Sequence, residues 1–247
     1  MKALILAAGY ATRLWPLTKN TPKPLLEVKG KPIVEHIISH ILELSDVSEI
    51  LIVTNDKFSL TFEQWAESFK CKIPVKIIND MTTSNDDRMG AVGDMRYVIK
   101  ETKLNDDLLV IAGDNLFEYK LKDFENYFLK KKASIVACKQ MDSIEDVKGK
   151  FGVVEVDKEG KIIGFAEKPE NPKTTLASTA CYLFTKADVL EINLYIEANN
   201  PPDNAGDFIS WLSKHKPVYG WIFREKWYDI GTFESLGKAR EEFSPSK

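Results

Sequence analysis

The residues best suited to chemistry gather near the N-terminus, where small residues alternate with cations. Residues 7–26 read Ala-Ala-Gly-Tyr-Ala-Thr-Arg-Leu-Trp-Pro-Leu-Thr-Lys-Asn-Thr-Pro-Lys-Pro-Leu-Leu. Small side chains would let backbone N–H groups approach a phosphate chain, and the guanidinium and ammonium groups supply positive charge. Residues 1–31 carry a net charge of +5, whereas the whole chain carries −3. The stretch therefore predicts a local anion site; its candidate residues are Ala8, Gly9, Ala11, Arg13 and Lys23.

Two further features concern single side chains of the candidate site. Lys23 stands between Pro22 and Pro24, which predicts that it lies in an extended loop and not in a helix. Taken alone, this tripeptide favours a simple connector between a loop and the next strand. Asp114 follows the apolar run Leu108–Ala112, and a carboxylate at the end of a buried strand is well placed to hold a hard cation. A simple turn would use the same residue types.

The elements that must position these residues follow an α/β pattern, because short apolar runs alternate with amphipathic stretches up to about residue 140. We expect a Rossmann-like, mostly parallel sheet with helices on both faces and a more antiparallel half beyond Ser134. The anion site would lie at the carboxyl end of the first strand, where open α/β sheets bind ligands. Expected strands are Lys2–Ala8, Ile50–Thr54, Val75–Ile78, Leu108–Ala112, Ser134–Cys138, Gly152–Val156, Lys161–Ala166 and Ala180–Phe184; expected helices are Pro32–Leu44 and Arg88–Lys100.

Composition and length narrow the class of protein. The 247 residues, 44% of them hydrophobic and 29% charged, suit one globular domain over 1–247 without an appended domain. The near balance of charge argues against a nucleic-acid or membrane partner. Cys71, Cys138 and Cys181 have no metal or disulfide spacing, and no signal or membrane segment follows the first strand. We expect a cytoplasmic protein with reduced thiols.

The N-terminal stretch resembles the signature of the sugar-1-phosphate nucleotidyltransferases, G-x-G-T-R-L-x-P-x-T followed by P-K-P. Residues 9–18 match it with one departure, Ala11 in place of the second glycine. Gly113-Asp114-Asn115 resembles the family's G-D-N, and residues 227–232, Trp-Tyr-Asp-Ile-Gly-Thr, resemble W-x-D-x-G-T. The resemblance implies Mg²⁺ held by Asp114 and Asp229, and a nucleotide bound by Ala8, Gly9, Tyr10, Ala11, Thr12, Arg13 and Lys23.

Further matches imply where a sugar phosphate would bind. Residues 151–154, Phe-Gly-Val-Val, resemble a segment whose glycine, here Gly152, lets the sugar lie against the backbone. Glu167-Lys168-Pro169 resembles E-K-P, in which the glutamate bonds sugar hydroxyls and the lysine grips the sugar's phosphate. The segment starting at Ser178 stands where T-G-(I/L)-Y lines the sugar pocket, with Ala180 replacing the glycine.

The base contact has two interpretations. In thymidylyl and uridylyl members a glutamine five residues before a glycine reads the pyrimidine, and here Asn85 precedes Gly90 by five. Asn85 has the same donor and acceptor set on a shorter arm. It could equally sit at the tip of a solvated loop that caps the following helix.

His36 and His40 have the spacing of a zinc pair on a helix, but position 37 is Ile and no third ligand follows. We predict that both are solvated helix residues off the apolar face. His215 stands in a polar, lysine-rich run and is predicted to lie on the surface.

The implied reaction is transfer of a nucleotidyl group from a nucleoside triphosphate, with dTTP or UTP favoured, to a sugar-1-phosphate, releasing pyrophosphate. Arg13, Lys23 and Asp114 would be the catalytic residues. Two alternatives stay open: a cytidylyltransferase acting on a phosphoalcohol such as phosphocholine or an inositol phosphate, and a non-catalytic subunit that binds nucleotide sugars. The resemblance also makes a homo-oligomer conceivable.

Overall fold

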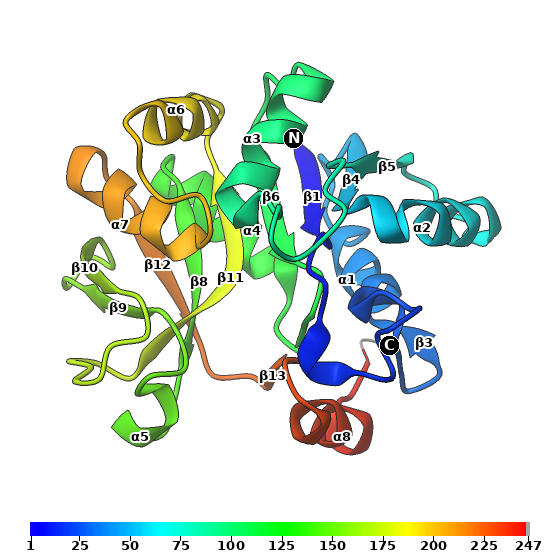
Figure 1. The fold of residues 1–247 in the computed structure, drawn as a ribbon. Coiled ribbons are helices and arrows are strands. Elements are labelled where there is room, and N and C mark those ends of the chain that lie inside the picture. The colour runs from blue at the N-terminus through cyan, green and yellow to red at the C-terminus, as the bar shows by residue number, and fades with distance from the viewer. Residues whose placement is uncertain (246–247) are drawn as a thin grey trace.

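The first half of the chain builds the parallel part of a nine-stranded sheet, as the alternating pattern predicts. The computed structural model describes residues 1–245. Its sheet runs in the order β10-β9-β11-β6-β1-β4-β5, with β8 and β12 joined through β11 (Figure 1). Strand β1 pairs in parallel with β4 and β6, and β4 pairs in parallel with β5. The bounds are Lys2–Leu6 (β1), Glu49–Thr54 (β4), Val75–Asn79 (β5) and Leu108–Ala112 (β6).

The second half extends the sheet with antiparallel strands, again as expected. Strand β11 runs antiparallel to β6, β8 and β9, and β9 pairs antiparallel with β10. Strand β12 lies parallel to β8. Two short ladders lie apart from the main sheet, β2 with β3 and β7 with β13. The remaining bounds are Glu27–Val28 (β2), Lys31–Pro32 (β3), Asn115–Phe117 (β7), Ile135–Gln140 (β8), Val153–Val156 (β9), Ile162–Ala166 (β10), Leu176–Phe184 (β11), Tyr219–Phe223 (β12) and Trp227–Asp229 (β13).

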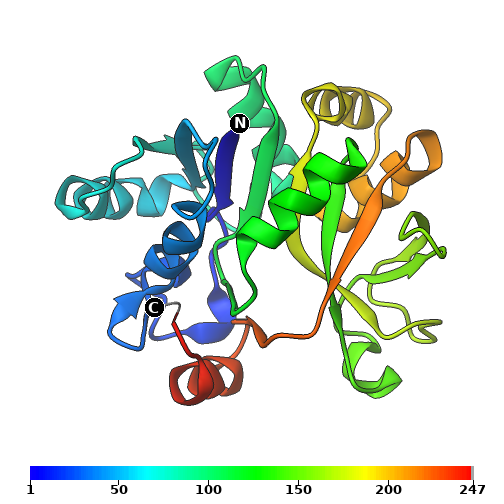
Figure 2. The ribbon, with the colours of Figure 1, turned by 180° about the vertical axis from the view of Figure 1, so that it is seen from behind.

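Helices cover both faces of the sheet, and each face has its own hydrophobic core. One core packs α1, α2, α4 and α8 against the sheet (Figure 2). Phe58 and Phe62 of α2 are fully buried in it. The other core packs α3, α6 and α7 against the opposite face. The bounds are Ile33–Ile41 (α1), Asp56–Ser68 (α2), Gly90–Thr102 (α3), Leu121–Lys131 (α4), Ile144–Val147 (α5), Lys186–Glu197 (α6), Ala205–His215 (α7) and Phe233–Glu242 (α8).

The prediction that His36 and His40 are solvated is wrong. Their side chains are only 4% and 3% exposed, because α8 and β7 cover the helix flank that the sequence leaves polar. The His36 ring packs edge-on against Phe243 with centroids 5.0 Å apart, and its Nε2 lies 2.8 Å from the Val28 carbonyl oxygen. Burial lowers the pKa of His40 to about 4, so its ring is neutral at pH 7. His215 is exposed, as predicted.

Two local predictions also change. Lys23 does not lie in an extended loop: Pro22 is extended, but Lys23 opens a single 3₁₀ turn, Lys23–Leu25, with Pro24 accommodated at its second position. Helix α3 begins at Gly90, two residues later than expected. Cys138 and Cys181 are buried and Cys71 is partly buried, all as free thiols. Within residues 1–245, every helix is too short or too polar to cross a membrane.

Candidate active site

A cavity of about 420 Å³ lies at the carboxyl ends of the central parallel strands, where the sequence places its anion site. It extends from Asp80, after β5, to Glu167, after β10. Its lining includes these residues of the sequence-predicted site: Ala8, Gly9, Ala11, Lys23, Gly90, Asp114, Gly152, Glu167, Lys168, Ser178 and Asp229. The described lining does not include Tyr10, Thr12, Arg13 or Asn85.

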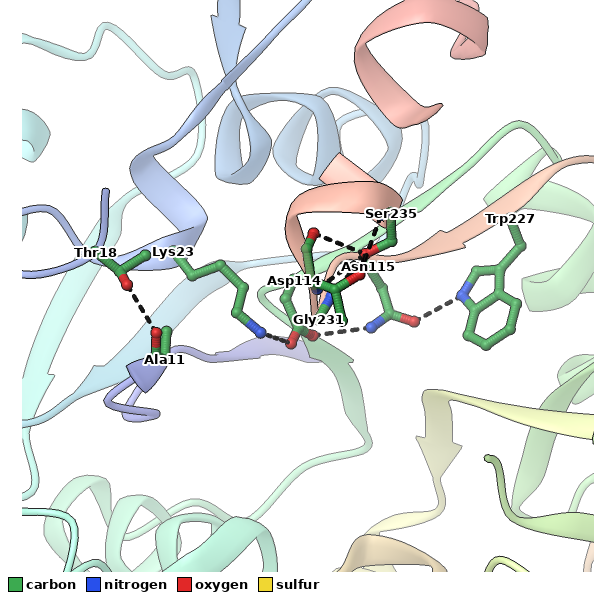
Figure 3. Close-up of polar contacts among 9 residues, drawn as sticks. Ala11, Thr18, Lys23, Asp114, Asn115, Trp227, Gly231 and Ser235 are labelled. Carbon is green, nitrogen blue, oxygen red and sulfur yellow. Dashed lines mark hydrogen bonds and ion pairs between the residues drawn. The ribbon is translucent and has the colours of Figure 1, made fainter. Parts of the chain in front are cut away.

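The loop after β1 lines the cavity with small residues and is tied together by a hydrogen bond of its own. Thr18 donates a hydrogen bond from Oγ1 to the Ala11 carbonyl oxygen over 2.7 Å, which closes the loop on itself (Figure 3). Ala11 has the left-handed backbone φ of 48° that favours glycine, which accounts for the glycine that the family signature has at this position. No described heavy atom lies within 4 Å of a Cβ built on Gly9, so nothing in the protein itself requires a glycine there.

Tyr10, Thr12 and Arg13 flank the cavity. The Tyr10 hydroxyl lies 3.3 Å from Thr82 Oγ1 and ties this loop to the segment after β5. Thr12 and Arg13 are exposed. The Arg13 guanidinium nitrogens would lie 3.8 and 3.9 Å from a Cβ on Gly231, so its charge reaches the β13 end of the cavity. The structure thus keeps Arg13 beside the site, although not in its wall.

Close packing positions Lys23 on Asp114. A Cβ on Gly113 would lie 2.8 Å from the Leu6 carbonyl oxygen and 2.9 Å from Pro24 Cγ, so only glycine lets the Lys23 turn pack this tightly on β1 and β6. Lys23 Nζ then donates to Asp114 Oδ2 over 2.6 Å (Figure 3). Asp114 Oδ1 accepts from Asn115 Nδ2 over 2.9 Å. Burial alone would raise the pKa of Asp114, but Lys23 and Asn115 hold it below its ordinary value.

The β7–β13 ladder brings Asp229 to Asp114 from the far end of the chain. In this ladder Asp229 is opposite Asn115, and the Ile230 N–H donates to the Asp114 carbonyl oxygen over 3.0 Å. Trp227 Nε1 donates to Asn115 Oδ1 over 2.6 Å, which fixes the amide that holds Asp114. Desolvation and the charge of Asp114 raise the pKa of Asp229 to about 6.

The two carboxylates fit a divalent cation. They face one cavity and repel each other, and a cation bound between them would remove that repulsion. Mg²⁺ commonly takes one or two protein carboxylates and completes its shell with phosphate oxygens and water. Among residues 1–245 there is no group of three or more His, Cys, Asp or Glu side chains that could hold a metal ion.

The opposite end of the cavity is built around Glu167. Its carboxylate lies between two glycines, because a Cβ on Gly206 would meet Oε2 at 2.6 Å and one on Gly152 would meet it at 3.1 Å. Burial raises its pKa. Lys168 has a left-handed φ of 42°, and its Nζ lies 3.8 Å from Glu167 Oε1. Ala180, at φ 52°, marks a bulge in β11 that turns this segment toward the cavity.

At the β5 end, Asn85 lies on an exposed loop but does not cap α3, whose N-cap residue is Met89 without a side-chain cap. Asn85 lies on the exposed segment 83–88, and its carbonyl oxygen accepts from Arg88. Gly90 has a φ of 77°, and a Cβ on it would lie 2.5 Å from Asp203 Cα, so the start of α3 packs directly on the loop before α7.

Several cavity residues escaped the sequence analysis. Asp80 and Asp94 are buried in its wall, and Asp203, Asn204 and Gly206 come from the loop and helix start after α6. The run Asn-Asn-Pro-Pro-Asp over 199–203 does identify a loop, but nothing in it shows that the loop returns to the site. Asp80 and Asp94 gave no signal because lone acidic residues near helices are common on surfaces.

The sheet places a lysine side chain and two carboxylates at the carboxyl ends of its central strands. This arrangement is typical of α/β enzymes that bind phosphorylated nucleotides. A family model described as nucleotidyl transferase matches residues 2–245, and the chain belongs to that family.

Curated relatives agree with this assignment, and a solved structure shares the fold. The chain is 35% identical to the bifunctional protein GlmU of Methanocaldococcus jannaschii over 94% of its own length, but it spans only about half (51%) of that relative. It is 26% identical to the UTP–glucose-1-phosphate uridylyltransferase AglF of Haloferax volcanii, covering 98% of this chain and 96% of the relative. A UDP-glucose pyrophosphorylase solved with UDP-glucose shares the fold, with a TM-score of 0.82, 24% identity, and coverage of 97% and 96%.

Proposed function

We propose that the chain catalyses Mg²⁺-dependent transfer of a nucleotidyl group from a nucleoside triphosphate to a sugar-1-phosphate, with release of pyrophosphate. The observation that carries the proposal is the convergence of Lys23, Asp114 and Asp229 in one cavity, between the Gly9 loop and Glu167. A pure binding protein has no need for two mutually repelling carboxylates beside a lysine.

The chain's own residues have to position two anions and balance charge, since a phosphate oxygen of the acceptor is itself the nucleophile. The backbone from Ala8 to Thr12, with Arg13, would bind the triphosphate. Lys23 would contact the α-phosphate, because its Nζ already donates to Asp114, the carboxylate that would hold Mg²⁺ beside that phosphate. Glu167 would bond sugar hydroxyls, with Gly152 and Ser178 beside it, and Lys168 would hold the sugar's phosphate.

Mg²⁺, held by Asp114 and Asp229 together with substrate phosphates, would neutralise charge on the transferred group. Asn115 and Trp227 keep Asp114 in place for this role. Arg13 lies on the Gly231 side, where it adds positive charge next to Asp229.

For the substrates we propose UTP or dTTP with a hexose-1-phosphate. Support comes from AglF, which matches over nearly its whole length and whose name describes a uridylyltransferase acting on UTP and glucose-1-phosphate. The chain's match to half of GlmU leaves other triphosphates as outcomes of the test. A cytoplasmic location, a single domain and a homo-oligomer remain predictions.

The test is a substrate panel. Purified protein with Mg²⁺ is given each of UTP, dTTP, CTP, ATP and GTP against sugar-1-phosphates and phosphocholine, and pyrophosphate release is measured. We expect release with UTP or dTTP and a sugar-1-phosphate, and none after Asp114→Asn. Release only with CTP and phosphocholine would replace the proposal by the cytidylyltransferase alternative. Nucleotide-sugar binding without release would point to a regulatory subunit.

A further inference from the structure

Two acidic side chains are buried against each other in the cavity wall, away from the proposed metal site. Asp80 follows β5 and is 1% exposed, and Asp94 on α3 is 6% exposed. Their carboxyl groups form a hydrogen bond with each other. Because an ionised carboxylate can only accept, this bond requires a proton on one of the two groups. Asp80 Oδ2 and Asp94 Oδ1 each expose less than 1 Å², so the pair is sealed inside the wall.

No cation compensates this acidic pair. Arg88 and Arg96, which precede and follow the second acid in the sequence, pair instead with Asp203 and Glu197. Within residues 1–245, no Lys, Arg or His side chain forms an ion pair with either acid. Two buried carboxyl groups in contact, with no cation beside them, cannot both ionise near neutral pH. The pair therefore holds one proton and carries one negative charge.

The surroundings of the pair keep this proton in place up to alkaline pH. Burial and the charge of Asp80 raise the pKa of Asp94 to about 8, and burial also raises the pKa of Asp80. The other ionisable groups around the pair and the neighbouring threonine, from the β1 loop, α2, the loop before α3 and α3 itself, are Tyr10, Asp56, Asp87 and Tyr97. None of them supplies a positive charge that would favour ionisation of both acids.

The pair is one end of a chain of hydrogen bonds whose other end is the loop after β1. Asp80 Oδ1 accepts from the Thr82 N–H over 2.7 Å and from Thr82 Oγ1 over 2.8 Å. Since the Thr82 hydroxyl gives its proton to Asp80, it can only accept from the Tyr10 hydroxyl, which lies 3.3 Å away. Tyr10 thus donates to Thr82, and both Thr82 and Asp94 donate to Asp80. In this chain Asp80 is the carboxylate and Asp94 is the acid.

We propose that the proton shared by the two acids positions the loop after β1 through Thr82 and Tyr10. Tyr10 stands between Gly9 and Ala11, whose backbone lines the cavity. Thr82 is 4% exposed and lies outside the described lining, so it acts on a ligand only through the loop. Loss of the proton leaves two repelling charges at the base of the chain and frees the loop. The positioning role rests on the proposed function above, whereas the shared proton does not.

The first experiment tests the shared proton and needs no activity. Urea unfolding is measured from pH 5 to 9 for the wild type, Asp94→Asn and the control Asp86→Asn, which removes an acid from the exposed loop before α3. The unfolded chain releases the Asp94 proton at about pH 4, whereas the folded chain keeps it up to about pH 8, so stability is lost as pH rises between these values. We expect the folding constant of the wild type relative to Asp94→Asn to fall about tenfold per pH unit from pH 5 to 7 and to level off above pH 8. The Asp86→Asn curve should stay parallel to that of the wild type.

The second experiment tests the positioning role by steady-state kinetics at saturating sugar-1-phosphate. Thr82→Val breaks the chain between Asp80 and Tyr10, so we expect KM for the nucleotide to rise about 2- to 13-fold, the net worth of one hydrogen bond, with kcat little altered. The matched control Thr102→Val loses only a bond to the Val98 carbonyl oxygen near the other end of α3 and should keep the wild-type KM. Above about pH 8 the wild-type KM should rise relative to that of Asp94→Asn, whose amide donates without titrating.

Each part of the inference has its own contrary result. Parallel unfolding curves for the wild type and Asp94→Asn would overturn the shared proton. A folded Thr82→Val that keeps the wild-type KM at every pH would overturn the positioning role. If the wild type turns over none of the triphosphates, the proposed function fails and the positioning role fails with it, while the unfolding curves still decide whether the proton is shared.

Discussion

The replacement Gly9→Ala tests whether a glycine is required at position 9 for ligand binding or for folding. A Cβ on Gly9 would have no described heavy atom within 4 Å, and its backbone is not in the left-handed region. The unfolded chain also loses conformational freedom when glycine becomes alanine. We therefore expect the free energy of unfolding to stay the same or to rise by about 0.4–1 kcal/mol.

Activity should respond in the opposite direction. If the Gly9 N–H and its neighbours approach the triphosphate, the added methyl group occupies space that the phosphates need, at a cost of about 1–3 kcal/mol. That corresponds to a loss of about 5- to 150-fold in kcat/KM for the nucleotide. The assay is pyrophosphate release at varied nucleotide, with thermal unfolding measured on the same samples.

A matched control is Gly237→Ala on α8, which also has open space at its Cβ and lies outside the described lining of the cavity. It should gain up to about 1 kcal/mol of stability, since alanine favours helix, and leave kcat/KM unchanged. If Gly9→Ala folds and retains wild-type kcat/KM, the β1 loop does not bind the triphosphate through close backbone contact.

Three further predictions concern charged groups of the site. Arg13→Ala should lower kcat by about 10²- to 10³-fold, the scale for losing one donor that stabilises developing charge, and a change confined to KM would contradict that role. Lys23→Ala should cause a comparable loss of turnover while leaving Asp114 beside Asp229 without its partner, so a fully active variant would make Pro22-Lys23-Pro24 a connector only. Because the pKa of Asp229 is raised to about 6, its carboxyl group must release a proton to bind Mg²⁺ below that pH. The apparent Mg²⁺ affinity, measured by kinetic titration, should therefore fall as pH decreases through 6. An affinity that stays constant from pH 7 to 5 would show that Asp229 is not a ligand.

The parts of this structure that the sequence predicts well are those fixed by local pattern. The apolar run Leu108–Ala112 becomes β6 with the expected bounds, since four of its five residues are fully buried between helices on both sides. The ten residues 9–18 predict a phosphate loop because small residues, Arg13 and Pro16 stand together over a short span after β1. Local pattern does not predict the contact between Lys23 and Asp114, since that contact depends on Gly113 allowing Pro24 to pack within contact distance.

What the sequence could not predict depends on long-range packing. His36 is covered by Phe243, which follows α8 more than 200 residues later in the chain, and His40 by Phe117 of β7. Periodicity within one helix cannot show either contact. Asp80 and Asp94 lie fourteen positions apart, one after β5 and the other on α3, and meet only in the folded chain. Their chemistry comes from burial, and burial of an acidic residue is the feature that sequence patterns indicate least.

The central claim is nucleotidyl transfer at the cavity that contains Asp114 and Asp229. The most direct measurement follows an α-³²P-labelled nucleoside triphosphate incubated with the protein, Mg²⁺ and a sugar-1-phosphate. The account predicts that the label appears in a nucleotide sugar with release of unlabelled pyrophosphate, and that Asp114→Asn prevents this. Label that stays in the triphosphate, or that ends in free nucleoside monophosphate at the same rate without the sugar phosphate, would contradict it.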